Sequence, residues 1–141
     1  EYHKECLETL RKAAAELKLP VASMMDTKGP EVRLGRFVDD KPVEIKNGDI
    51  YTLTTENCLC TDKIGSVTFK KLPEDVTVGT RILINDGVIE LLAEKVTATE
   101  IVCRIIHGGR LSNNKGINVP GVKLSMPYLS DADMILNSAL K

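Results

Sequence analysis

The sequence predicts a mainly β protein in which a small β-barrel is inserted between two α/β segments. Short β-rich runs alternate with turn signals from about residue 35 to residue 122, and this spacing is typical of a small barrel or sandwich. An amphipathic stretch and a short apolar run precede them, and a helix-start signal follows them. The two ends of the chain are therefore expected to belong to one host domain that the barrel interrupts.

The first segment is expected to be a helix over residues 2–19, followed by a buried strand. Pro20 ends the helix, because proline lacks the amide hydrogen that a helix interior needs. The continuous apolar run from Val21 to Met25 then suits a strand buried on both faces, as in a parallel sheet. Apolar residues of the helix recur on one face at helical spacing: Leu7, Leu10, Ala14 and Leu17.

The central region is expected to contain short strands joined by tight turns. Asn47-Gly48-Asp49 and Asn85-Asp86-Gly87 are turn signals, and the second lies between two apolar runs, as in a β-hairpin. Beyond this region, Ser130 is a candidate helix N-cap with Asp133 three residues later. The expected strands cover residues 43–45, 50–54, 66–69, 81–84, 88–94, 96–99 and 101–107.

Composition narrows the classes of function. The chain has 141 residues, a net charge of −1, 28% charged residues and only 4% aromatic residues. A nucleic-acid site would favour a strongly basic face, and single-stranded nucleic acid would favour more aromatic side chains. No apolar run approaches the roughly 20 residues that span a bilayer. The composition therefore favours a globular domain that binds neither nucleic acid nor membrane.

The cysteines and the start of the chain point to a cytoplasmic protein and to a longer parent. The chain contains 4 cysteines and 2 histidines, whose spacing matches no zinc pattern. Reduced thiols in a cytoplasmic protein are the expected interpretation, although Cys58-Leu59-Cys60 is a conceivable soft-metal site. The chain begins at Glu1 without an initiator Met, so we expect it to be a piece of a longer protein.

The most informative motif occupies residues 25–33, with the sequence Met-Asp-Thr-Lys-Gly-Pro-Glu-Val-Arg. It follows the predicted buried strand, and chemistry in parallel α/β proteins is placed at the carboxyl ends of strands. The motif closely resembles the Leu-Asp-Thr-Lys-Gly-Pro-Glu-Ile-Arg signature of pyruvate kinases. The resemblance implies that Asp26 and Thr27 help to hold a potassium ion. Their oxygens suit a hard cation, whereas from the residues alone Asp26 could simply cap the turn.

Arg33 ends this motif. A guanidinium just beyond a strand can bind a phosphate through paired hydrogen bonds, or it can be a solvated residue at the base of the inserted barrel. The resemblance implies that Arg33 is catalytic, contacts the transferred phosphoryl group and contributes to nucleotide binding. Lys28 and Glu31 belong to the same motif, and neither receives a catalytic role.

Two further motifs extend the resemblance along the chain. Ile84-Asn85-Asp86-Gly87-Val88 resembles the Val-Asp-Asp-Gly-Leu turn of the pyruvate kinase lid, which implies that Asp86 faces the nucleotide. The Gly-rich stretch 108–121 resembles the signature that ends Lys-Lys-Gly-Val-Asn-Leu-Pro-Gly. This implies that Lys115 contacts nucleotide phosphates, with Asn114 in place of one lysine. The residues alone also fit a hairpin turn and a solvated loop.

The resemblance runs the whole length of the chain and divides it into three parts. Residues 1–31 would be a helix and strand of a (β/α)₈ barrel, residues 32–122 the lid called the B domain, and residues 123–141 the return to the barrel. The fold class is thus a B-domain-like β-barrel inserted between α/β segments of a partial (β/α)₈ barrel. A competing interpretation is a small β-barrel module that binds nucleic acid or protein, and a third is a purely structural or regulatory insert.

The resemblance also implies an activity for the parent protein. Pyruvate kinases are glycolytic transferases that move the phosphoryl group of phosphoenolpyruvate to ADP, which gives ATP and pyruvate, with Mg²⁺ and K⁺ as cofactors. The chain alone is expected to be inactive because the magnesium ligands of the family lie on later strands. The parent is expected to be a homotetramer, and the chain itself to self-associate through its exposed barrel segments.

Overall fold

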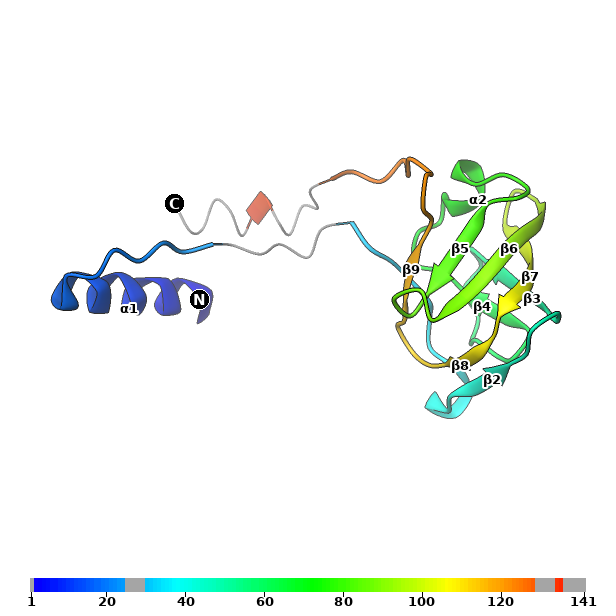
Figure 1. Ribbon diagram of the computed structural model, residues 1–141, viewed down its shortest axis with the longest axis horizontal. Helices are drawn as coiled ribbons and strands as arrows, with labels where there is room; N and C mark the ends of the chain where they lie inside the picture. Colours follow the sequence, from blue (N-terminus) through cyan, green and yellow to red (C-terminus); the bar gives the residue numbers. More distant parts are fainter. Residues whose placement is uncertain (1, 25–29, 129–133, 136–141) are drawn as a thin grey trace. The chain divides into compact units, whose positions relative to one another are not determined.

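The computed structural model describes residues 2–24, 30–128, 134 and 135. The chain divides into two compact units, one formed by Glu1–Pro30 and Met126–Lys141 and the other by Glu31–Ser125. Among the described residues, all of the strands lie in the second unit (Figure 1). None of the described helices is long and apolar enough to cross a lipid bilayer.

The first unit contains one long helix, α1 (Tyr2–Leu17), as the sequence predicts. None of its residues is buried. The prediction of a strand from Val21 onward is wrong over residues 21–24, which have no regular structure and leave Met24 91% exposed. A strand requires a neighbour to satisfy its backbone groups, and no described residue pairs with this run. Met25, Ser130 and Asp133 lie outside the described residues.

The second unit is built on a seven-stranded sheet in the order β1-β9-β5-β6-β7-β3-β4. Neighbouring strands are antiparallel except for β3 and β4, which are parallel. The fold is therefore mainly β and mainly antiparallel, as predicted. The strands are β1 (Val32–Arg33), β3 (Ile50–Thr54), β4 (Ile64–Ser66), β5 (Arg81–Ile84), β6 (Ile89–Val96), β7 (Glu100–His107) and β9 (Gly116–Asn118).

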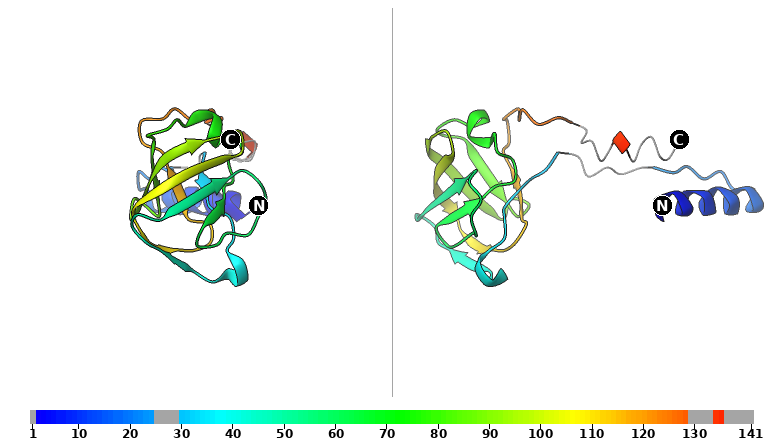
Figure 2. Two further views of the ribbon diagram at one scale, coloured as in Figure 1. Left: turned by 90° about the vertical axis from the view of Figure 1, so that its right-hand side faces the viewer. Right: turned by 180° about the vertical axis from the view of Figure 1, so that it is seen from behind.

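The sheet curls until its two edge strands meet (Figure 2). Leu34, just after β1, forms an antiparallel bridge with Val67, just after β4. The Thr68 amide donates to the Arg33 carbonyl at 3.0 Å, and the Gly35 amide donates to the Ser66 carbonyl at 2.9 Å. A Cβ at Gly35 would clash with Ser66 Oγ, which is held by its hydrogen bond to the Cys58 carbonyl, so any larger residue would force this seam between the edge strands to shift.

Smaller elements surround the sheet. β2 (Val43–Ile45) and β8 (Gly109–Leu111) form a separate antiparallel pair. The 3₁₀ turn η1 (Val38–Asp40) and the short helix α2 (Leu72–Asp75) complete the unit. Asp75 Oδ2 accepts hydrogen bonds from the Ser125 amide at 2.7 Å and the Ser125 hydroxyl at 3.1 Å, which fixes the last residue of the unit to α2.

Alternating burial along the strands creates the core. Successive side chains of a strand point to opposite faces. The inward positions of β5, β6 and β7 are apolar, whereas the outward positions mix apolar and charged side chains. The inward positions are less than 2% exposed: Ile82, Ile84, Ile89, Leu91, Ala93, Ile101, Cys103 and Ile105. The barrel thus has one continuous apolar interior.

Three strand predictions differ from the structure. β4 covers residues 64–66 rather than 66–69, because the chain leaves the sheet after the seam. Of the predicted strand over 96–99, Val96 ends β6 and residues 97–99 form a turn in which the Thr97 amide donates to the Glu100 carbonyl at 2.8 Å, so β6 and β7 form one long hairpin. The Gly-rich stretch 108–121, expected to be a loop, contains β8 and β9.

Candidate functional site

Three of the predicted site residues come together on β1 and on the turns beside its neighbouring strands. β9 lies between β1 and β5 and pairs with both. Val32, Ile117 and Ile84 form a row across these strands and are at most 4% exposed. In the next row outward, Arg33 pairs with Gly116, whose carbonyl accepts the Asn85 amide at 3.1 Å. Arg33, Lys115 and Asp86 therefore occupy or adjoin one outward-facing row.

Arg33 is held by three hydrogen bonds. Its Nε and Nη2 donate to the two carboxylate oxygens of Glu31 at 2.9 and 3.0 Å. Residues two apart on an extended segment point the same way, which explains this pairing. Nη1 donates to the Asn114 carbonyl at 2.7 Å. The side edge of the guanidinium is thus paired with Glu31, and its end edge, between Nη1 and Nη2, still has donors with which to meet a phosphate.

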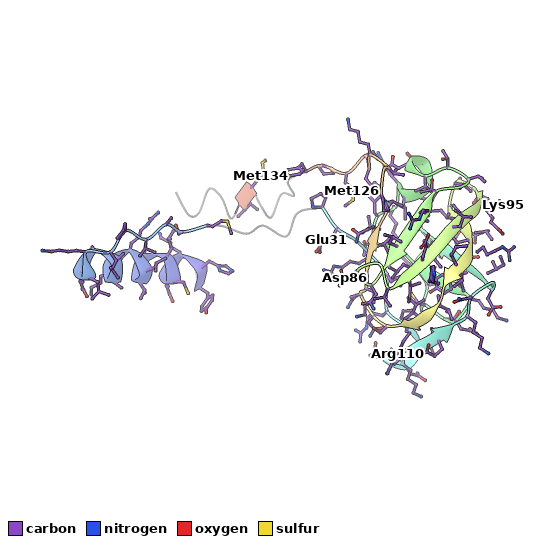
Figure 3. All side chains as sticks on the ribbon, viewed as in Figure 1. Glu31, Asp86, Lys95, Arg110, Met126 and Met134 are labelled. Atoms are coloured by element: carbon purple, nitrogen blue, oxygen red, sulfur yellow. The ribbon has the colours of Figure 1, made fainter. Side chains whose placement is uncertain are left out.

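The charges around Arg33 stabilise its protonated form. The hydrogen bond and charge of Glu31 raise the pKa of the Arg33 guanidinium, and the charge of Asp86 raises that pKa further. Asp86 is exposed, and Figure 3 shows it with Glu31 at the same edge of the barrel unit. The candidate site therefore contains a fixed cation with two carboxylates near it.

Arg104 provides a structural counterpart of Arg33 elsewhere on the barrel. Its Nε and Nη2 donate to Glu94 at 2.6 and 3.0 Å, and its Nη1 donates to the Gly48 carbonyl at 2.9 Å. The same three-bond arrangement thus occurs on strand β7. A guanidinium fixed by three hydrogen bonds can belong to a catalytic arginine or to a structural one. Arg104 is therefore a matched control for experiments on Arg33.

The turn that carries Asp86 has the conformation that its residues favour. Asn85, Asp86 and Gly87 have φ values of 56°, 56° and 86°, and the Val88 amide donates to the Asn85 carbonyl at 3.1 Å. Ile84 pairs with Ile89 across the hairpin. The hairpin prediction is confirmed, because Asn, Asp and Gly tolerate the left-handed backbone that tight hairpins need.

Lys115 follows a turn that is joined to the start of the barrel. Its carbonyl accepts the Leu34 amide at 2.8 Å, and the Asn114 amide donates to the Gly35 carbonyl at 3.3 Å. The Lys115 side chain is half-buried. Its ammonium group has no hydrogen-bond or ion-pair partner among the described residues, which leaves a positive charge free for an anionic ligand.

The structure does not test every predicted site residue. Asp26 and Thr27, the predicted potassium ligands, lie outside the described residues. Within the described part of the chain, no group of three or more His, Cys, Asp or Glu side chains is placed to hold a metal ion. Cys58 is exposed and Cys60 is buried.

Sequence reasoning missed the residues that support the site. Glu31 received no role, although its spacing of two residues from Arg33 in an extended segment was a usable signal. Asn113 and Asp40 were not identified, and Asn114 was noted only as standing in place of a lysine. Their contacts join segments more than 70 residues apart in sequence, so no local pattern could have revealed them.

The chain matches the family model described as pyruvate kinase, barrel domain, over residues 1–140. It is 44% identical over 135 residues to pyruvate kinase 2 of Synechocystis sp., which covers 94% of this chain and 23% of that protein. It is 36% identical over 132 residues to a pyruvate kinase of Mycobacterium intracellulare, which covers 94% of this chain and 28% of that protein.

A solved structure shares the fold as well as the sequence. A pyruvate kinase from Cryptosporidium parvum superposes with a TM-score of 0.87 at 33% identity, over 93% of this chain and 27% of that chain. The chain thus spans about a quarter of the length of the relatives that it matches.

Proposed function

The chain belongs to the pyruvate kinase family, and we propose that it is the lid-bearing part of an enzyme that transfers the phosphoryl group of phosphoenolpyruvate to ADP. The observation that carries this proposal is the row formed by Arg33, Gly116 and Asn85. It assembles residues of three separate sequence motifs at one edge of the barrel. Residues 32–122 would be the lid, and residues 1–31 and 123–141 its connections to a (β/α)₈ barrel.

The chemistry of phosphoryl transfer suits the charges of this site. The protein positions the phosphates and neutralises charge, with little covalent chemistry of its own. Arg33 would be catalytic: its end edge would contact the phosphoryl group as its charge redistributes, and it would also contribute to nucleotide binding. Lys115 would bind nucleotide phosphates through its ammonium group. Asp86 would face the nucleotide and its metal from the adjacent turn.

Mg²⁺ and K⁺ are the proposed cofactors of the complete enzyme. Magnesium would supply charge neutralisation for the phosphates, and potassium would add further positive charge. The carboxylate of Asp26 and the threonine oxygen of Thr27 are donors suited to potassium. Because the described residues include no metal-binding cluster, the magnesium ligands would come from other parts of the enzyme.

The partners and location follow from the same proposal. Phosphoenolpyruvate and ADP would be the substrates, in a cytoplasmic homotetramer that binds neither nucleic acid nor membrane. The chain alone would self-associate through α1, since Leu10 and Leu17 are 40% and 68% exposed and exposed apolar surface favours association. Free thiols at all four cysteines are consistent with a reducing compartment.

The direct test measures pyruvate and ATP formation by the full-length enzyme, as wild type, Lys115→Ala and Lys95→Ala. Lys95 is exposed and lies at the opposite side of the barrel unit from Asp86 (Figure 3). We expect turnover that requires phosphoenolpyruvate and ADP, is impaired by Lys115→Ala and is unchanged by Lys95→Ala. Absence of turnover together with oligonucleotide binding at low salt would instead support the alternative β-barrel binding module.

A further inference from the structure

We propose that Asn113 is a positioning residue, whose side chain clamps the Lys115 turn to the η1 segment through the Phe37 amide and Asp40. This inference rests on the proposed function, because the purpose of the clamp is to fix Lys115 and Arg33 relative to each other. It concerns a residue that contacts neither substrate nor metal in that proposal.

The clamp begins at a rigid point of the barrel. The Phe37 side chain is 2% exposed and its backbone forms a bridge with Cys60. On either side of Phe37, the Val38 amide donates to the Cys60 carbonyl at 3.1 Å and the Cys60 amide donates to the Arg36 carbonyl at 2.8 Å. A buried ring and two backbone bonds thus fix the direction of the Phe37 amide, which makes it a firm anchor.

Both ends of the Asn113 side-chain amide form hydrogen bonds, one with this anchor and one with Asp40. Its Oδ1 accepts the Phe37 amide at 2.7 Å, and its Nδ2 donates to Asp40 Oδ1 at 2.8 Å. The two bonds determine which way the amide faces, since the reverse orientation would place donor against donor and acceptor against acceptor. Asn113 is half-buried, so its bonds compete only partly with water.

Asp40 is itself held in place. Arg36 donates to its two oxygens from Nε at 3.0 Å and from Nη2 at 2.7 Å. The hydrogen bond from Arg36, followed by that from Asn113, lowers the pKa of the Asp40 carboxyl. Asp39 and Asp40 both have left-handed backbones, with φ of 53° and 56°. Aspartate tolerates this conformation, and the turn presents the charged Asp40 carboxylate as an acceptor to Asn113.

The clamp is linked through the backbone to the two proposed phosphate-binding residues. Asn114, next in the chain, has a φ of 58°, and its carbonyl accepts a hydrogen bond from Arg33 Nη1. The Lys115 carbonyl accepts a hydrogen bond from the Leu34 amide. Three successive residues, 113–115, are therefore bonded to the segment 33–40. These bonds restrict the position of the Lys115 backbone. Such restriction favours a lysine that must contact a phosphate at a fixed position.

The test exchanges the polarity of the clamp in the full-length enzyme. Asn113→Asp places a carboxylate against Asp40, and the double variant Asn113→Asp with Asp40→Asn restores a hydrogen bond of reversed direction. We expect Asn113→Asp to raise the KM for ADP roughly 3- to 10-fold, the equivalent of one hydrogen bond. The double variant should recover most of this loss. Should Asn113→Asp fail to fold, Asn113→Ala removes the clamp without adding charge.

Asn47→Ala is the matched control. Asn47 Oδ1 accepts the Gly108 amide at 2.7 Å, so this variant removes a similar bond away from the site. It should lower the thermal midpoint, by less than Asn113→Ala because it removes one bond rather than two, while leaving the KM for ADP unchanged. An unchanged KM in both Asn113 variants, with a raised KM in Lys115→Ala, would overturn the clamp and leave the proposed function standing. If Lys115→Ala is also without effect, the clamp and the proposed nucleotide-binding role of Lys115 both fall, while the proposed phosphoryl transfer is tested separately by turnover of the wild-type enzyme.

Discussion

Arg33 and Asn114 are joined by a 2.7 Å hydrogen bond from guanidinium Nη1 to the backbone carbonyl, although 81 residues separate them in sequence. Arg33 lies on β1, where the chain enters the barrel, and Asn114 lies in the turn that leads to β9. The bond therefore connects the residue proposed to meet the transferred phosphoryl group with the turn that presents Lys115. A substitution at either residue is therefore expected to shift the position of the other.

Arg33→Ala and Lys115→Ala should impair the full-length enzyme in different ways. Arg33 would stabilise charge that develops in the transition state, so its loss should lower kcat by roughly 100-fold or more. Lys115 would bind nucleotide phosphates from a mobile lid, so its loss should raise the KM for ADP with a smaller effect on kcat. Steady-state kinetics with ADP and phosphoenolpyruvate varied separately distinguish the two effects.

Arg104→Ala controls for the structural part of the Arg33 effect. It breaks the same set of bonds, to a glutamate and to a backbone carbonyl, and it should leave kcat unchanged. A wild-type kcat in Arg33→Ala, with only KM altered, would remove the catalytic role of Arg33. An equal fall in kcat in Arg104→Ala would show that the effect is one of stability.

The 141-residue chain by itself should have no pyruvate kinase activity. It spans only 23% and 28% of two related enzymes, and its described residues contain no metal-binding cluster. Missing groups that contact the reacting phosphoryl typically cost orders of magnitude each. A coupled assay for pyruvate at high chain concentration provides the measurement, and turnover that scales with the chain would contradict the prediction.

Gly35→Ala should destabilise the barrel unit by about 1–3 kcal/mol, the usual effect of overpacking. A Cβ at Gly35 would clash with Ser66 Oγ at the seam where the edge strands meet. Gly116→Ala is the control, because a Cβ there meets no atom within 4 Å. Urea denaturation of the isolated chain gives both free energies of unfolding, and equal values for the two variants would argue against a tight seam.

Acid should destabilise the barrel through Asp40 and Glu90. Hydrogen bonds from Arg36 and Arg81, respectively, lower the pKa values of these carboxyls in the folded chain. A lowered pKa stabilises the fold above the ordinary carboxyl range, and this stability is lost as pH falls through the folded-state pKa. Thermal midpoints should therefore decline below roughly pH 4. Asp40→Asn should make that decline shallower, and an unaltered pH profile would refute the contribution of Asp40.

Local patterns in the sequence were sufficient for much of the secondary structure. The helix Tyr2–Leu17 and the hairpin around Asp86 formed as predicted, because helical periodicity and left-handed turn residues act over a few neighbours. The strand expected at Val21 was wrong, because an apolar run becomes a strand only when another strand pairs with it. β8 and β9 were missed for the opposite reason, since Gly-rich sequences have weak strand propensity and depend on their neighbours.

The sequence by itself determined the family, the mainly β fold class and the three motifs that suggest a phosphate site. It could not determine how those motifs meet. Only the tertiary structure decided that β9 lies between β1 and β5, and this strand order places Arg33, Asp86 and Lys115 at one edge. The supporting bonds that Asn114 accepts from Arg33 and that Asn113 accepts from the Phe37 amide depend on barrel closure. Pairing between residues distant in sequence is set by the packing of the whole core, which no local pattern encodes.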